Sequence, residues 1–203
     1  MASVTISNSP FHVACIMTRV YGYISSSYAC GWHTGIDLVS MEQDKTIYSV
    51  CSGTVVQTVN STSGSLGTYV LIHADDGTYW RYCHMVYNSI QVTVGQRVST
   101  ATAIGTMGAT GNVSGAHLHL EHATAAAWAC GNFVNPCDYL QIPNVRNTYI
   151  YYSGSPTPPE PPEPPEPPEP PVPIPEIKKK FPWPVVTRKI RKRGNEKWKK
   201  NLI

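Results

Sequence analysis

A chain of 203 residues with 41% hydrophobic residues can bury the core of one ordinary domain without disulfide staples. It holds no stretch of the ~20 apolar residues that a membrane helix requires. The net charge of +3 is unevenly distributed, because residues 1–155 carry five Lys and Arg against seven Asp and Glu, whereas residues 176–203 carry eleven against two. The predicted folded part is thus nearly neutral, and the basic character belongs to a C-terminal tail.

Short β-strands with turns between them are predicted up to about Ser153. β-branched, apolar and aromatic residues gather in short or alternating runs at 54–59, 68–73, 78–84, 90–94 and 117–122. Asp75-Asp76-Gly77 has the composition of a turn, so the strands on either side of it are expected to form a hairpin. Helical propensity is confined to the Ala-rich residues 123–130. We therefore predict an all-β domain over residues 1–153, built as an antiparallel β-sheet or a barrel-like arrangement.

The C-terminal part of the chain has a different composition. Residues 154–176 are dominated by a Pro-Pro-Glu repeat and hold thirteen of the 18 prolines. Such a run adopts polyproline II at ~3.1 Å per residue, which predicts a stiff spacer. Residues 177–203 are basic, contain Trp183 and Trp198, and are predicted to be disordered. This tail is either a solvated extension or a contact to an anionic wall polymer, a membrane surface or nucleic acid.

The six cysteines are scattered along the chain without a CxxC pair. They are Cys15, Cys30, Cys51, Cys83, Cys130 and Cys137. In a domain of this size disulfides are optional. The sequence therefore leaves open whether these residues are small buried side chains or form one or more disulfides.

Histidines and one aspartate form three patterns that metal chemistry explains. His33 and Asp37 stand four apart, and a glycine between them would permit the chain to bend so that both reach one point. His117 and His119 stand two apart on a predicted strand, so their side chains share one face. His84 ends the predicted hairpin strand. Neutral imidazoles with a carboxylate suit zinc, and three protein ligands with one open position are typical of a catalytic site.

These patterns, in this order, resemble the three motifs of the lysostaphin-type zinc metallo-endopeptidases, which hydrolyse peptidoglycan. The likeness is carried by His33–Asp37, by Tyr82–Met85 and by Thr110–Glu121. It extends to connecting segments such as Val94–Val98 and Asn135–Leu140, and spans roughly residues 10–140. The family's fold is accordingly expected for this part of the chain.

The resemblance implies that His33, Asp37 and His119 hold Zn²⁺ and that His84 and His117 are the catalytic histidines. One of the two would accept a proton from the attacking water, and the other would stabilise the oxyanion and protonate the leaving amine. The sequence does not divide these roles between them.

Three further histidines, His12, His73 and His122, are interpreted as structural. For His122 a second interpretation remains, in which it lies behind a metal ligand and orients it. Neither interpretation requires contact with substrate.

The implied function is hydrolysis of amide bonds in the stem peptides or cross-bridges of peptidoglycan. The alternative is a non-catalytic peptidoglycan-binding or hydrolase-activating module, although such modules lose metal ligands and all of them are present here. A structural zinc protein would instead favour clustered cysteine ligands. No secretory signal is visible at Met1–Thr5, so we expect action at the bacterial cell wall as a phage lysin or virion component, the alternative being a bacterial enzyme exported by other means or recorded without its leader.

Overall fold

The computed structural model describes residues 2–154. Apart from Gly154, the predicted spacer and the basic tail lie outside the described residues. Within them, no helix is long and apolar enough to cross a membrane.

The described residues are almost entirely β-structure, which confirms the predicted fold class. In chain order the elements are β1 (Ser3–Ile6), β2 (Cys15–Arg19), β3 (Gly35–Ser40), β4 (Thr46–Tyr48), β5 (Gly53–Val59), β6 (Thr68–Ala74), β7 (Tyr79–Met85), β8 (Arg97–Val98), β9 (Ala103–Thr106), β10 (Leu118–Ala123), the 3₁₀ turn η1 (Cys130–Asn132), β11 (Phe133–Val134), α1 (Pro136–Leu140) and β12 (Tyr149–Tyr152).

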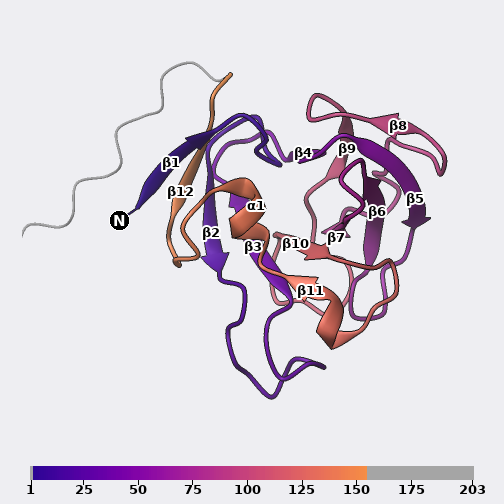
Figure 1. Ribbon diagram of the computed structural model, residues 1–203, viewed down its shortest axis with the longest axis horizontal. Helices are drawn as coiled ribbons and strands as arrows, with labels where there is room; N and C mark the ends of the chain where they lie inside the picture. The colour runs from indigo at the N-terminus through magenta and orange to yellow at the C-terminus, as the bar shows by residue number, and fades with distance from the viewer. Residues whose placement is uncertain (1, 155–203) are drawn as a thin grey trace, which may run out of the picture. The chain divides into compact units, whose positions relative to one another are not determined.

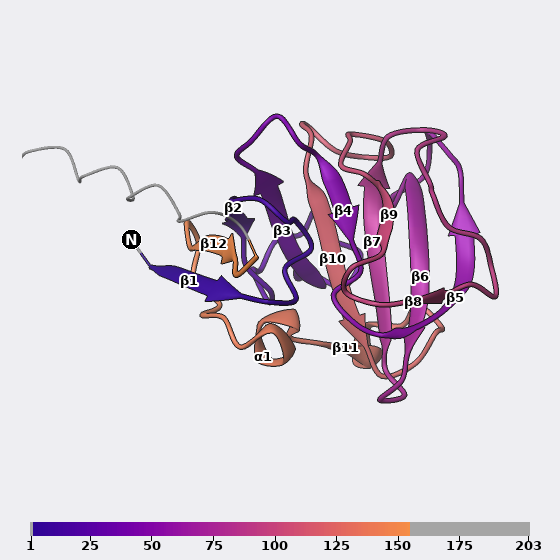
Figure 2. The ribbon, with the colours of Figure 1, turned by 90° about the horizontal axis from the view of Figure 1, so that it is seen from above.

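One large sheet carries most of the strands, in the order β1-β12-β2-β3-β10-β7-β6-β5-β8, with β11 paired to β10. Its pairs are antiparallel except β1 with β12, which run parallel. β1, β12 and β2 lie at one end of this order, and β5 and β8 lie at the other (Figure 1). Figure 2 shows β10, β7 and β6 side by side, with the small β4–β9 sheet beside them.

The hydrophobic core lies between these two sheets. Trp80 and Tyr82 of β7 and Leu118 and Leu120 of β10 are fully buried, and they share one cluster with Ile47 of the small sheet. Because side chains alternate along a strand, Arg81 between the two buried residues of β7 and His119 between those of β10 point to the other face of the large sheet. That second face is where the polar side chains of β10 gather.

The predicted hairpin is confirmed, with β6 and β7 paired antiparallel across the Asp75-Asp76-Gly77 turn. Gly77 adopts a φ of 87°, and the Asp76 carboxylate accepts hydrogen bonds from the backbone N–H and the hydroxyl of Thr78. These are the features by which Gly and Asp favour tight turns.

The predicted strand at residues 90–94 is not formed. Val92 is buried, but Val94 is 60% exposed, so the apolar alternation does not continue. The Gln91 N–H donates to the Ile104 carbonyl, and a turn from Thr93 to Gln96 then ends the contact. The segment therefore runs beside β9 without forming a ladder of backbone hydrogen bonds with it.

The Ala-rich residues 123–130, which have helical propensity, form no α-helix. Ala123 remains in β10 opposite Phe133, and the residues after it form bends that connect β10 to β11. The Thr124 N–H donates to the Asn132 carbonyl across this connection. Tertiary pairing thus overrides the helical propensity of alanine. The helix that does form, α1, begins where the Asn135 side chain accepts a hydrogen bond from the Cys137 N–H.

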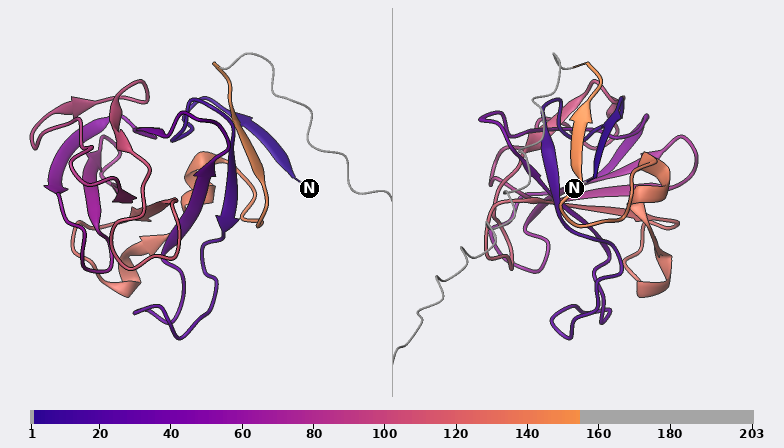
Figure 3. Two further views of the ribbon diagram at one scale, coloured as in Figure 1. Left: turned by 180° about the vertical axis from the view of Figure 1, so that it is seen from behind. Right: turned by 90° about the vertical axis from the view of Figure 1, so that its left-hand side faces the viewer.

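Both interpretations left open for the cysteines occur in one molecule. Cys30 and Cys130 form a disulfide across 100 residues, whereas Cys15, Cys51, Cys83 and Cys137 are free and buried. The disulfide joins the loop before β3 to the connection after β10. Figure 3 shows that loop, between β2 and β3, extending beyond the sheet.

We expect the variant Cys30→Ser with Cys130→Ser to lose about 2–4 kcal/mol of unfolding free energy, because the disulfide closes a long loop in the unfolded chain. Denaturant titration measures the difference, and reductant should lower the stability of the wild type without affecting the variant. Titration of six free thiols in the unreduced, unfolded protein would contradict this prediction.

Candidate metal centre and active site

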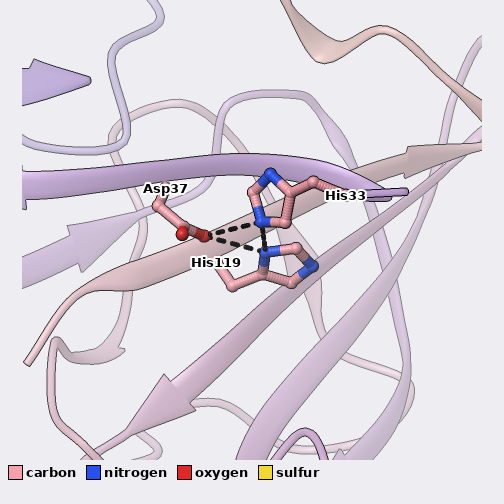
Figure 4. Close-up of side chains that lie close together, drawn as sticks. All are labelled: His33, Asp37 and His119. Carbon is pink, nitrogen blue, oxygen red and sulfur yellow. Dashed lines mark hydrogen bonds and ion pairs between the residues drawn. The ribbon is translucent and has the colours of Figure 1, made fainter. Parts of the chain in front are cut away.

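Two neighbouring strands and one loop bring the three predicted metal ligands together. Asp37 in β3 lies directly opposite His119 in β10, and His33 stands two residues before β3. Each of the three offers one ligand atom, and these atoms all lie within 4.8 Å of one another (Figure 4). His33 and His119 are buried, and the Asp37 side chain is 13% exposed. The centre therefore lies just below the surface on the second face of the sheet.

The ligand atoms converge on a single point. Asp37 Oδ1 lies 3.0 Å from His33 Nε2 and 3.0 Å from His119 Nδ1. The two imidazole nitrogens lie 3.0 Å from each other. The dashed triangle in Figure 4 joins these three atoms.

The outer nitrogen of each imidazole is already engaged. His33 Nδ1–H donates to the Val20 carbonyl at 2.9 Å, and His119 Nε2–H donates to Glu121 Oε1 at 3.2 Å. The inner nitrogens therefore present lone pairs toward each other and toward a carboxylate oxygen. Two lone pairs and an anion at this spacing repel one another unless a cation lies between them. This donor set, two neutral imidazoles and one carboxylate, fits zinc.

The charges around His119 favour a positive charge at the same point. Although burial by itself lowers the pKa of His119, hydrogen bonds to Asp37 and Glu121 raise it to about 9. Burial raises the pKa of Asp37, but hydrogen bonds from His119 and His33 bring it well below its ordinary value. A divalent cation would take the place of the proton that these carboxylates otherwise stabilise on His119.

Glu121 is the residue behind the ligands that the sequence analysis did not identify. Its Oε1 accepts hydrogen bonds from His119 and, at 2.6 Å, from the hydroxyl of Thr34. Its Oε2 accepts one from Arg81 Nη1 at 2.7 Å, and both members of this ion pair are buried. A carboxylate that receives the second N–H of a metal-bound imidazole fixes its tautomer and orientation. The signal was in the sequence, since Glu121 stands two residues after His119 and shares its strand face.

His122 does not orient a ligand, which corrects the second interpretation given to it. It points to the core face, where its ring stacks on Trp80 with centroids 4.2 Å apart. His12 and His73 likewise lie away from the centre, His12 stacked between Tyr48 and Tyr152 and His73 stacked on Tyr79.

Gly35 is required for a different reason from the bend expected of it. It lies within β3 and has an ordinary negative φ. A Cβ at this position would stand 2.3 Å from the Leu120 carbonyl oxygen and 3.0 Å from His119 Cε1. Only glycine allows β3 to approach β10 this closely beside the metal ligands.

His84 and His117, the predicted catalytic pair, lie beside the three ligands. Their ring centroids are 4.9 Å apart, and the His84 ring lies 5.8 Å from that of His119. His117 Nε2 lies 3.6 Å from Asp37 Oδ1, and its side chain is 18% exposed. Each ring donates Nδ1–H to a backbone carbonyl, that of Thr110 for His84 and that of Gly115 for His117. Both Nε2 atoms are thereby left as proton acceptors.

The backbone of His84 has a conformation that few side chains other than glycine adopt. Its φ is 63°, which costs about 1 kcal/mol or more in the left-handed region. This conformation breaks the strand alternation after Cys83 and directs the ring toward the centre. Burial, followed by the neighbouring His119 and His117, lowers the pKa of His84 to about 4. His84 is therefore neutral at physiological pH.

Comparison with known proteins identifies the family. The family model described as "Peptidase family M23" matches residues 31–136. The chain belongs to peptidase family M23. It is 38% identical over 89 residues to the peptidoglycan DD-endopeptidase ShyA of Vibrio cholerae, a match that covers 44% of this chain and 20% of ShyA. It is 33% identical over 94 residues to endolysin 2638A of Staphylococcus phage 2638A, which covers 45% of this chain and 19% of the endolysin. This M23 chain thus matches about a fifth of the length of these relatives.

Solved structures of M23 peptidases share the fold. The catalytic domain of the antimicrobial peptidase lysostaphin from Staphylococcus simulans aligns with a TM-score of 0.53 and 25% identity, covering 62% of this chain and 91% of that domain. LytU aligns with a TM-score of 0.51 and 27% identity, covering 63% of this chain and 86% of its own. The alignments therefore span nearly all of each neighbour and leave parts of this chain unmatched.

We expect Glu121→Gln to weaken zinc binding about 10- to 100-fold, because the amide no longer accepts the His119 N–H as a charged group and no longer balances Arg81. Competition with a chromophoric chelator measures the affinity. Glu42→Gln, which changes an exposed carboxylate, is the matched control. Thr34→Val keeps the carboxylate and should have a smaller effect. Unchanged affinity in a folded Glu121→Gln protein would contradict the role of Glu121.

Proposed function

We propose that this chain is a zinc-dependent endopeptidase that hydrolyses amide bonds in the stem peptides or cross-bridges of bacterial peptidoglycan. The observation that carries the proposal is the convergence of His33, Asp37 and His119 on one point with His84 and His117 beside them. The relatives named as a peptidoglycan DD-endopeptidase and an endolysin support the substrate class.

Zinc would be held by His33 Nε2, Asp37 Oδ1 and His119 Nδ1, the three atoms that meet at the centre. When bound, it supplies a Lewis acid that activates water and polarises the scissile carbonyl. The buried carboxylate of Glu121 and the backbone carbonyl of Val20 keep both imidazoles in the tautomer that can bind it.

His84 and His117 perform the proton transfers. Each has a fixed Nδ1–H and an Nε2 lone pair, so one ring accepts the proton of the attacking water. The other ring, which takes up a proton from solvent before the substrate binds, donates a hydrogen bond from Nε2–H to the developing oxyanion and gives that proton to the leaving amine, and the water proton held by the first ring then returns to solvent. The strained backbone of His84 is consistent with this role, since such strain is retained where the geometry of a side chain matters.

A non-catalytic wall-binding or hydrolase-activating module is the second candidate. It would need the fold and a binding surface but neither the metal ligands nor the histidine pair. All five of these side chains are present and oriented to one point, which favours the enzyme. In either case the site of action would be the bacterial cell wall, and the endolysin relative favours a phage lysin or a virion-associated hydrolase.

The protein should clear suspensions of purified cell walls, lose this activity on treatment with a chelator, and regain it with added zinc. Loss of turbidity over a panel of walls with different cross-links measures it. Failure to clear any wall, with zinc bound and the protein folded, would contradict the proposal and favour the binding module.

Two variants in the same assay separate metal binding from proton transfer. His119→Ala should lose both zinc and activity, whereas His117→Ala should retain zinc and lose about 10²- to 10⁴-fold in rate. His73→Ala, which removes a ring stacked on Tyr79 away from the centre, is the control. Equal zinc loss in the His117 and His119 variants would argue against the assigned roles.

The basic tail is proposed to hold the enzyme near an anionic wall polymer or membrane surface. Deletion of residues 156–203 should leave hydrolysis of soluble cross-linked peptides unchanged and weaken sedimentation with intact walls, most strongly at low salt. A truncated protein that lost activity on the soluble peptides would contradict a tethering role.

A further inference from the structure

An irregularity in β2 brings a positive charge to the metal centre. In the pairing of β2 with β3, Met17 lies opposite Leu38 and Arg19 lies opposite Asp37, so the extra residue Thr18 forms a β-bulge. Without the bulge, Thr18 would face Asp37, and Arg19 would face the buried Ile36. A bulge that changes the direction of a side chain is common beside active sites. Here it places a guanidinium on the same face as a metal ligand.

Arg19 is held at this position by aromatic side chains. Its Nη1 donates a hydrogen bond to the hydroxyl of Tyr28, and its guanidinium carbon lies 5.2 Å from the ring centroid of Tyr23 and 5.9 Å from that of Tyr28. The Tyr28 ring in turn lies 5.1 Å from the ring of His33. The tyrosines thus connect the guanidinium to the wall of the metal centre and restrict its motion.

The charge of Arg19 is only weakly compensated. Its Nε lies 3.9 Å from Asp37 Oδ2, which is too long for a hydrogen bond, and its side chain is 46% exposed. Among residues 2–154, Asp37 is the only carboxylate within 4.0 Å of it. Asp37 directs its other oxygen, Oδ1, at the two imidazoles. Once the Asp37 carboxylate holds a divalent cation, it neutralises little of the positive charge of the guanidinium.

The second ion pair of the site, unlike that of Arg19, is buried. Arg81 and Glu121 lie 2.7 Å apart with both side chains almost fully buried, so they neutralise each other. Arg19 is therefore the cation of this site that can receive an anionic group from outside. It also lies before the residues 31–136 that match the family, so the family assignment gives it no role.

We propose that Arg19 binds a carboxylate of the substrate next to the scissile amide, and so selects cross-links that carry such a group over neutral oligoglycine bridges. This inference rests on the proposed peptidoglycan endopeptidase function and specifies its substrate class. A planar guanidinium binds a carboxylate through two parallel hydrogen bonds. Because Arg19 Nε lies 3.9 Å from Asp37 Oδ2, a carboxylate paired with the guanidinium would lie within roughly two residue lengths, ~7 Å, of the centre. Cross-links to a diamino dicarboxylic acid, in which the amide nitrogen is bonded to a carbon that bears a carboxylate, have this chemistry.

The test compares two synthetic cross-linked stem-peptide dimers that differ in one group, the carboxylate beside the scissile amide or the matching carboxamide. Wild-type protein should hydrolyse the carboxylate dimer with a kcat/KM about 10- to 100-fold higher. In Arg19→Gln, kcat/KM should fall for the carboxylate dimer alone, so that the preference is lost. Arg19→Lys should keep part of the preference. Arg97→Gln, which changes an exposed arginine paired with Asp75, is the matched control and should keep all of it.

Two further readouts separate substrate recognition from support of the metal ligand. Zinc bound per chain should be equal in wild type and Arg19→Gln. In the His117→Ala background, which is expected to bind without hydrolysis, Arg19→Gln should weaken binding of the carboxylate dimer and leave the carboxamide dimer unaffected. An equal fall in kcat/KM on both dimers with reduced zinc would show that Arg19 only positions Asp37, and would overturn the inference.

The outcomes also distinguish this inference from the function on which it rests. Equal hydrolysis of both dimers by the wild type, or clearance only of walls with oligoglycine bridges, would overturn the role of Arg19 and leave the endopeptidase function standing. Failure to hydrolyse either dimer or any wall would overturn both.

Discussion

The pairing of β3 with β10 determines whether the proposed metal ligands Asp37 and His119 meet at one point. In the observed register Asp37 lies opposite His119, while Leu38 and Ile36 lie opposite Leu118 and Leu120 and point into the core. A slip of one residue in either strand would turn the ligand of that strand to the opposite face and expose its leucines or isoleucine. Burial of these apolar side chains therefore specifies the register, and the register aligns the ligands. The close approach at Gly35 is part of the same constraint, since any side chain there would push the two strands apart.

Around this pairing, the protein surrounds a small group of lone pairs with fixed hydrogen-bond partners. The four histidines of the site each give one ring N–H to an acceptor, in three cases a backbone carbonyl and in the fourth Glu121. These acceptors cannot rotate away, because strands, tight loops or a buried ion pair hold them. The second nitrogen of each ring therefore presents its lone pair to the centre. Such preorganisation lets a metal bind, and a proton move, with little rearrangement.

The loop between β2 and β3 connects several of these features. It carries His33, it is joined through Cys30 to the connection after β10, and it contributes the tyrosines that hold Arg19. Strands from two parts of the sheet and one loop therefore meet at a single polar surface. The disulfide restrains the loop at a point three residues before a metal ligand, so the stability of the loop and the geometry of the centre are linked.

The sequence by itself determined the all-β class, the β6–β7 hairpin and the family, and it selected five candidate site residues whose roles stay predictions. It could do so because these depend on local patterns, such as alternation along a strand, an Asp-Asp-Gly turn and histidines at short spacings. Only the tertiary structure decided the pairing of Cys30 with Cys130, the role of Glu121 behind His119, the left-handed backbone of His84 and the position of Arg19 beside Asp37. Each of these depends on contacts between residues far apart in the chain or on a bulge in a strand. The strand predicted at residues 90–94 is absent, and the helical propensity of residues 123–130 is not realised, for the same reason: the partners that these segments meet in the folded protein override local propensity.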